Sequence, residues 1–218
     1  MVKKAPAAKR PGRRSGQSDT RAQILDAART RFTQVGYRAA TMRAIATDVG
    51  VDPALISYFF GSKEQLFGAA FELRANPAMV ISGQIAGPLA ALPERLLTAL
   101  VHTWDDPANR STLLTIAQTG DDAGGFALTR GFVEEALEKP ILDRLLAEGV
   151  PAGDARRASA MLATTLVGVI YARYVLAIDA AAEVPGDAFI AGYLPVVRAA
   201  LSGCVPSAHP SPTADPSE

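Results

Sequence analysis

The stretch of residues 41–63 constrains the fold most, because it carries the ends of several helices close together in the sequence. Side chains that cap a helix N-terminus alternate there with glycines, which adopt the positive φ found where helices end. These boundary residues are Thr41, Gly50, Asp52, Gly61 and Ser62. Pro53 follows a capping residue, and the first turn of a helix accepts proline because no N–H donor is needed there. The stretch therefore predicts three short helices that begin after residues 41, 52 and 62.

Residues 42–61 also have the spacing of a helix-turn-helix. Ala46 provides a small side chain where two helices approach closely, and Gly50 lies where the turn between them needs positive φ. Apolar residues occupy the positions that hold the second helix against the first, namely Ile45, Val49, Val51, Ile56 and Phe59. An ordinary helical hairpin fits the same spacing, so the charge of the segment is needed to decide between the two interpretations.

The charge of the chain is divided between its two parts. Residues 1–63 hold twelve Lys and Arg but only four Asp and Glu, a net charge of +8, although the whole chain is neutral. Such a basic segment indicates a polyanionic partner, with double-stranded DNA as the first candidate and an anionic membrane surface as the second. The arm at residues 3–14 carries six of these bases. We expect it to lie on phosphates or in a minor groove, and a solvated tail is the alternative.

Helical periodicity continues through the rest of the chain without a hairpin or an alternating pattern, so we expect an all-α fold. The first helix should begin near residue 18 and end at Gly36, with one apolar face made of Ile24, Leu25, Ala28, Phe32 and Val35. The later helices are expected at 62–74, 78–86, 89–104, 107–119, 123–147, 152–181 and 186–203. The apolar run at 161–178 contains Arg173, and we expect a buried helix there with no membrane span.

These segments predict two domains between two disordered ends. A disordered basic arm should cover residues 1–17, followed by a three-helix helix-turn-helix domain at 18–75. A helical bundle for ligand binding and dimerisation should cover 76–203, and a Pro/Ser-rich disordered tail should cover 204–218.

Residues 19–71 resemble the N-terminal domain of the tetracycline-repressor (TetR) family of bacterial transcription regulators. The resemblance rests on the order and spacing of Gly36-Tyr37, Thr41, Ile45-Ala46, Gly50-Val51, the aromatic cluster and Phe60-Gly61-Ser62-Lys63-Glu64-x-Leu66. It implies a cytoplasmic, nucleoid-associated regulator, most simply a dimeric repressor that a small-molecule effector releases from a palindromic operator. A regulator or activator without an effector is one alternative. A helical membrane-surface or protein-interaction module is the alternative outside this class.

The recognition helix of such a domain enters the major groove with its N-terminal residues near the base edges. Four apolar residues are expected on its inner face: Leu55, Ile56, Phe59 and Phe60. The residues left to face DNA are Pro53, Ala54, Ser57 and Tyr58. None of these can make a bidentate contact with a base, so we expect Arg43 to make the main base contact. Thr41 and Lys63 are expected to hold phosphates.

One residue departs from the pattern of the family. Ser57 stands where many relatives have a tyrosine, so we transfer the usual tyrosine–phosphate contact to Tyr58. Half-buried packing of Tyr58 is the alternative.

A single helix-turn-helix reads few bases, so such proteins bind as dimers to two half-sites. The resemblance implies a four-helix homodimer interface built from the last two long helices of each chain. The apolar residues assigned to it are Leu162, Leu166, Val169, Tyr174, Tyr193, Leu194, Val197 and Leu201. The alternative is that these residues form only the core of one protomer.

The resemblance also implies a ligand cavity among the central helices. The residues assigned to it are mostly apolar with a few polar groups: His102, Trp104, Gln118, Phe126, Thr165 and Tyr171. Such a lining favours a small apolar or aromatic effector, although each residue taken alone also fits a core. The chain has one cysteine and two histidines without metal-ligand spacing, and it lacks a phosphate-binding loop. We therefore expect no catalytic residues, no metal and no cofactor.

Overall fold

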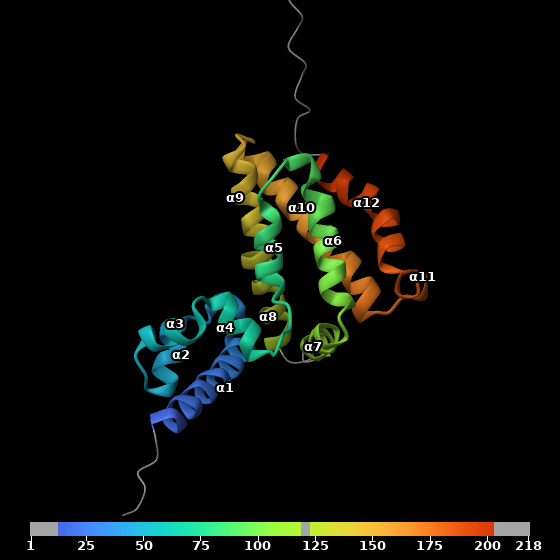
Figure 1. Cartoon of the computed structure of the whole chain (residues 1–218). Coiled ribbons are helices and arrows are strands. Elements are labelled where there is room, and N and C mark those ends of the chain that lie inside the picture. The colour runs from blue at the N-terminus through green and yellow to red at the C-terminus, as the bar shows by residue number, and fades with distance from the viewer. Residues whose placement is uncertain (1–12, 119–122, 203–218) are drawn as a thin grey trace, which may run out of the picture.

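The computed structural model describes residues 13–118 and 123–202, and within these ranges the chain is helical with no strand, which confirms the all-α fold. Four helices form the N-terminal part (Figure 1): α1 (Arg13–Ala39), α2 (Met42–Val49), α3 (Pro53–Phe60) and α4 (Lys63–Ala70). The remaining helices stand beside them as a bundle: α5 (Pro77–Ile85), α6 (Leu92–Asp105), α7 (Pro107–Gln118), α8 (Ala123–Val133), α9 (Lys139–Ala147), α10 (Ala152–Ile170), α11 (Asp179–Ala182) and α12 (Gly186–Ser202).

The predicted caps set the ends of α2, α3 and α4. The hydroxyl of Thr41 accepts from the backbone N–H of Ala44 at 3.1 Å, and the carboxylate of Asp52 accepts from the N–H of Ala54 at 2.7 Å. Gly50 has a φ of 73°, in the left-handed region. The predicted capping box is also present, because Ser62 and Gln65 each accept a hydrogen bond from the backbone N–H of the other at 3.2 Å.

Helix α1 differs from the expectation at its beginning and on its apolar face. It begins at Arg13, earlier than expected, so residues 13–17 belong to the helix and not to the arm. At its other end Gly36 interrupts the helical backbone with φ 79° and ψ 167°, as its assignment to the end of the helix predicted. The assignment of Val35 to the apolar face is wrong, since Val35 is 42% exposed. The chain turns at Gly36, and Tyr37 fills the core in its place.

The N-terminal core joins all four of its helices. It is built from Ile24, Ala28, Phe32, Tyr37, Ile45, Ile56, Leu66 and Phe67, all of which are buried. The Phe32 ring stacks on Tyr37 at 5.6 Å between centroids and meets Phe67 edge-on at 5.2 Å. Outside this core, Arg31 of α1 makes a bidentate ion pair with Asp48 of α2 at 2.5 and 2.6 Å. These contacts fix α2 and α3 on α1.

The connection from α4 to the bundle is a turn, although a helix was expected up to residue 74. Helix α4 ends at Ala70, and Glu72 has a positive φ of 56°. The fully buried Asn109 of α7 holds this turn, because its side-chain oxygen accepts from the N–H of Arg74 at 3.0 Å and its amide donates to the Thr103 carbonyl at 3.0 Å. The two parts of the protein are therefore not joined by one continuous helix.

Two long helices of the bundle contain a π-helical turn. Residues Glu134–Glu138 form one between α8 and α9, and Tyr171–Val175 form the other at the end of α10. The predicted helix at 152–181 is therefore wrong in its end, because the chain leaves the helix after Val175. Buried Arg173 explains the new path, since it donates to the carbonyl of Val184 at 2.8 Å and lies 3.4 Å from Asp105.

Residues 152–175 form the one described helix that is long and apolar enough to cross a membrane. Half of its most apolar window is buried inside the bundle, as in the core helix of a globular domain. Its inward residues meet a core that extends over α6, α9, α10 and α12.

Candidate DNA-binding surface and effector cavity

Helix α3 presents a small exposed face. Ile56 and Phe60 are buried in the N-terminal core, and Leu55 and Phe59 are half-buried beside them. The four residues expected to face DNA are all exposed: Pro53, Ala54, Ser57 and Tyr58. Tyr58 is 75% exposed, so the alternative of a half-buried packing residue does not hold. This face offers two hydroxyls and otherwise apolar groups.

Arg43 lies exposed in the first turn of α2, beside the capping residue Thr41. Other arginines of the N-terminal part are engaged, as Arg31 pairs with Asp48 and Arg38 lies 3.8 Å from Glu134. Arg43 takes part in none of the ion pairs found among residues 13–118 and 123–202. Its guanidinium, with five N–H donors, is therefore exposed and outside the ion pairs of the described residues.

Lys63 is less available than the sequence suggested. Its ammonium donates to the Arg38 carbonyl at 3.3 Å and lies 4.3 Å from the centre of the Tyr37 ring. Burial lowers the pKa of Lys63, and the nearby carboxylates of Glu135 and Glu64 oppose this effect. Lys63 therefore holds the end of α1 after its kink at Gly36, and its contact with a phosphate stays a prediction.

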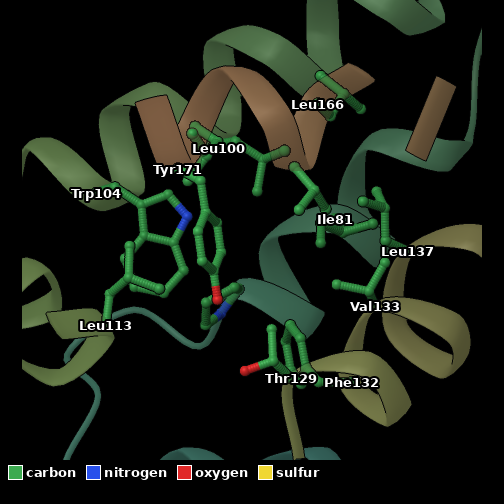
Figure 2. Close-up of a pocket in the computed structure, with 13 residues that line it drawn as sticks. Ile81, Leu100, Trp104, Leu113, Thr129, Phe132, Val133, Leu137, Leu166 and Tyr171 are labelled. Carbon is green, nitrogen blue, oxygen red and sulfur yellow. The ribbon is translucent and has the colours of Figure 1, made fainter. Parts of the chain in front are cut away.

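The bundle contains a small apolar cavity of about 80 Å³ between α5, α6, α7, α8 and α10. Its wall is formed by Pro77, Ile81, Leu100, Trp104, Leu113, Thr129, Phe132, Val133, Leu137, Leu166, Val167, Ile170 and Tyr171. Figure 2 shows the rings of Trp104 and Tyr171 beside each other, with Thr129 and Phe132 at the other end of the cavity. The wall contains no charged side chain, so it favours a neutral ligand.

The cavity includes only part of the residues assigned to it from the sequence. Trp104 and Tyr171 line it, but His102 and Thr165 do not. His102 is exposed on the outer face of α6, 3.7 Å from Asp187, and Thr165 donates to the Met161 carbonyl on the outer side of α10. The side chains of Gln118 and Phe126 are outside the described part of the structure.

Sequence reasoning missed Phe132, which belongs to two sites at once. It lines the cavity and also stacks on Phe67 of the N-terminal core, with 5.2 Å between centroids and 27° between ring planes. It meets Tyr37 edge-on at 5.5 Å. No pattern in the sequence distinguishes this phenylalanine from an ordinary core residue.

The assignment of the dimer interface needs correction. Six of its eight residues are buried within a single protomer: Leu162, Leu166, Val169, Tyr174, Val197 and Leu201. They pack between α6, α10 and α12, where a partner chain cannot reach them, and Tyr193 and Leu194 are half-buried against the same core. The outer faces of α10 and α12 instead expose small and apolar residues, among them Thr164, Gly168, Gly192 and Val196.

Comparisons with known proteins agree with this architecture. A family model described as "Bacterial regulatory proteins, tetR family" matches residues 24–70, and one described as "Tetracyclin repressor-like, C-terminal domain" matches residues 90–201. The "Uncharacterized HTH-type transcriptional regulator YhgD" of Bacillus subtilis (strain 168) is 27% identical over 138 residues, covering 62% of this chain and 71% of its own.

Two further proteins are similar at higher identity. The "HTH-type transcriptional dual regulator CecR" of Shigella flexneri is 31% identical over 155 residues, covering 62% of this chain and 67% of its own. A crystal structure of a TetR-family regulator from Streptomyces coelicolor A3 is 30% identical, with 88% of this chain and 99% of that chain covered and a TM-score of 0.47.

Proposed function

The chain belongs to the TetR family of bacterial transcriptional regulators, and on this basis we propose that it is a dimeric repressor, released from a palindromic operator by an apolar small molecule. As a member of this family it is a DNA-binding regulator and not an enzyme. The observation that carries the proposal is the exposed face of α3 together with the exposed and unpaired Arg43.

We infer that α3 enters the major groove while α2 places Arg43 at a base edge. A guanidinium can donate two hydrogen bonds to guanine O6 and N7, whereas the exposed face of α3 has only the hydroxyls of Ser57 and Tyr58. Pro53 and Ala54 suit contact with thymine methyl groups, and the N-terminus of α2 at Thr41 suits a phosphate. Specificity should then depend on Arg43 and on the shape of the duplex.

The proposed dimer uses the outer faces of α10 and α12. Small side chains such as Gly168 and Gly192 let two helices approach closely, and Val196 is 57% exposed in a single protomer. Val196→Glu should therefore give a monomer. Leu146→Glu is the matched control, because Leu146 is also an exposed aliphatic residue but lies on α9. Sedimentation velocity distinguishes the two outcomes, and a dimeric Val196→Glu protein would contradict the assignment.

The effector part of the proposal rests on the apolar wall of the cavity. A neutral aromatic molecule fits the rings of Trp104 and Tyr171, and the Thr129 hydroxyl can offer one hydrogen bond. The alternative is a regulator without an effector, or an activator, and a relative named as a dual regulator gives that alternative some support.

The test begins with the selection of a duplex from a random pool and measures the affinity of the protein for it. Arg43→Ala should cost about 1–3 kcal/mol on the selected duplex and much less on random DNA. Arg198→Ala is the control, because it removes the same charge from α12, far along the chain from α2 and α3. Since α12 also carries the proposed dimer face, sedimentation velocity checks that this variant dimerises as the wild type does. Equal losses on both duplexes would make Arg43 a phosphate contact. Binding to anionic vesicles without duplex selection would favour a membrane-surface module instead.

A further inference from the structure

The cavity is too small for the ligand that its wall would suit. Sites for small molecules usually measure about 300–1,000 Å³, whereas this one measures about 80 Å³. An effector must therefore displace part of the wall before it can bind. The effect of the effector on the DNA-binding helices depends on which residues of the wall move. It therefore depends on what packs behind each of these residues.

Most of the wall belongs to the large core of the bundle. Leu100, Leu137 and Leu166 are buried there with side chains of α9, α10 and α12 around them. Phe132 differs because it packs on the N-terminal core, behind which lie the DNA-binding helices. Its neighbour Val133 lines the same cavity but packs on the core of the bundle.

Phe132 also borders a second apolar cavity of about 50 Å³, which it shares with Phe67 and Leu128 of the N-terminal core, so the coupling rests on the backbone of α8 and not on the Phe132 ring alone. The backbone of α8 lies directly on the last residues of α1, the turn at residues 36–40: a Cβ added to Gly131 would be 2.9 Å from the Arg38 nitrogen, and one added to Gly36 would be 3.0 Å from the Ala127 oxygen. Arg38 also faces the carboxylates of Glu134 and Glu135 at 3.8 and 3.7 Å. A shift of α8 therefore displaces residues 36–40 as well.

Residues 36–40 lead straight into the proposed DNA contacts. Ala40 is buried, and the next residue is Thr41, which caps α2 two residues before the exposed Arg43. Lys63 is bound to the same turn through the Arg38 carbonyl. By contrast, α4 ends at Ala70 and a turn follows it, so α4 cannot act as a rigid rod between cavity and DNA.

From these contacts we propose that α8, through Phe132 and its seat on the 36–40 turn, transmits the filling of the cavity to the DNA-binding helices. The inference rests on the proposed effector response and adds the path by which it acts. Filling the cavity presses Phe132 on Phe67 and Tyr37, moves the turn and changes the position of Thr41 and Arg43. The connection through α4 has a secondary part.

The test compares two neighbouring substitutions in the full-length protein. Phe132→Leu keeps an apolar wall but removes the ring contacts with Phe67 and Tyr37, and Val133→Ala changes the same wall without touching the N-terminal core. The probe is N-phenyl-1-naphthylamine, a neutral aromatic fluorophore. Fluorescence reports its binding, and anisotropy reports affinity for the selected duplex with and without it.

Saturating probe should weaken duplex binding at least tenfold in the wild type and in Val133→Ala, but less than threefold in Phe132→Leu. The affinity of each protein for the probe and for the duplex alone is measured first, and the effect of the probe is expressed as the ratio of duplex affinities of the same protein with and without saturating probe. Wild-type weakening in Phe132→Leu would overturn the inference. Loss of the response in Val133→Ala as well would overturn it too, because cavity volume alone would then explain the result.

A built-in filler separates this inference from the proposed effector response. Val167→Phe adds a ring to the cavity from α10, and circular dichroism checks that the variant folds. It should weaken duplex binding in the wild-type and Val133→Ala backgrounds and have little effect with Phe132→Leu. If the probe does not bind or does not act while Val167→Phe behaves in this way, the effector proposal fails and the path stands. If a folded Val167→Phe protein binds the duplex normally, the path is wrong.

Discussion

The contact between α8 and the 36–40 turn can be tested by one methyl group at Gly131. In a helix interior, alanine is more stable than glycine by roughly 0.5–1 kcal/mol. At Gly131 the added Cβ would lie 2.9 Å from the Arg38 backbone nitrogen, and backbone cannot move aside as the end of a side chain can. Such overpacking costs about 1–3 kcal/mol. Gly131→Ala should therefore lower the free energy of unfolding by about 1 kcal/mol, since the overpacking exceeds the gain.

Gly83 provides the matched control, because it lies in α5 and a Cβ there meets nothing within 4 Å. Gly83→Ala should raise stability by about 0.5–1 kcal/mol. Urea unfolding followed by circular dichroism gives both values, and their difference isolates the cost of the contact, about 1–3 kcal/mol. If Gly131→Ala gained as much stability as Gly83→Ala, the contact between α8 and the 36–40 turn would be loosely packed. A shift of α8 would then not displace Thr41.

Three further predictions concern other contacts. Asn109→Ala should cost roughly 2–4 kcal/mol in urea unfolding, because it leaves the Arg74 N–H and the Thr103 carbonyl without their partner; a loss below about 0.5 kcal/mol would contradict this role. Arg31 holds the pKa of Asp48 below its ordinary value, so the pair stabilises the fold above that value and loses this effect as the pH falls through the lowered pKa. The gap in melting temperature between wild type and Asp48→Asn should therefore be present at pH 7 and shrink as the pH falls through the lowered pKa of Asp48. A gap that stays constant between neutral and acid pH would exclude this cause. Deletion of residues 1–12, which the structure does not describe, should weaken binding equally on all duplexes and flatten the slope of log K against log[salt]. An unchanged slope would show that the arm does not contact phosphates.

The ends of α2 and α3 and the start of α4 were predictable because each depends on one residue and its neighbours. Thr41, Gly50, Asp52 and Ser62 act through local hydrogen bonds or a local φ, and these are written in the sequence at fixed spacing. The exposed face of α3 followed from the same helical period. Val35 was misplaced because Tyr37, which follows the break at Gly36, fills the place in the core that the helical period assigned to Val35.

The long-range features could not be read in this way. An apolar residue such as Leu162 gives the same pattern whether its neighbour is its own chain or a partner, and only the packing of α6 shows that it is internal. The turn at 71–76 depends on Asn109, which is distant in sequence. His102 was assigned to the cavity for its polarity, but the helix turns it outward to Asp187. Phe132 gave no signal, because its importance comes from two cores that meet only in the folded chain.

The exposed face of α3 offers few groups that can read bases, and this makes DNA binding sensitive to the small shift that we propose α8 transmits. Because the exposed face of α3 has no side chain for a bidentate base contact, the specific part of the binding energy should rest mainly on Arg43 and the phosphates near Thr41. Thr41 directly follows the 36–40 turn, on which α8 packs, and Arg43 comes two residues later. A shift too small to unfold any helix would still misplace Arg43, the group that we propose distinguishes operator from random DNA, while the phosphate contacts proposed for the basic arm would be unaffected. Filling the cavity should therefore reduce specificity more than total affinity, so the effector should weaken binding to the selected duplex far more than binding to random DNA. Equal weakening of both would mean that the whole DNA-binding part leaves the duplex, as expected if the two protomers moved apart and Arg43 kept its position.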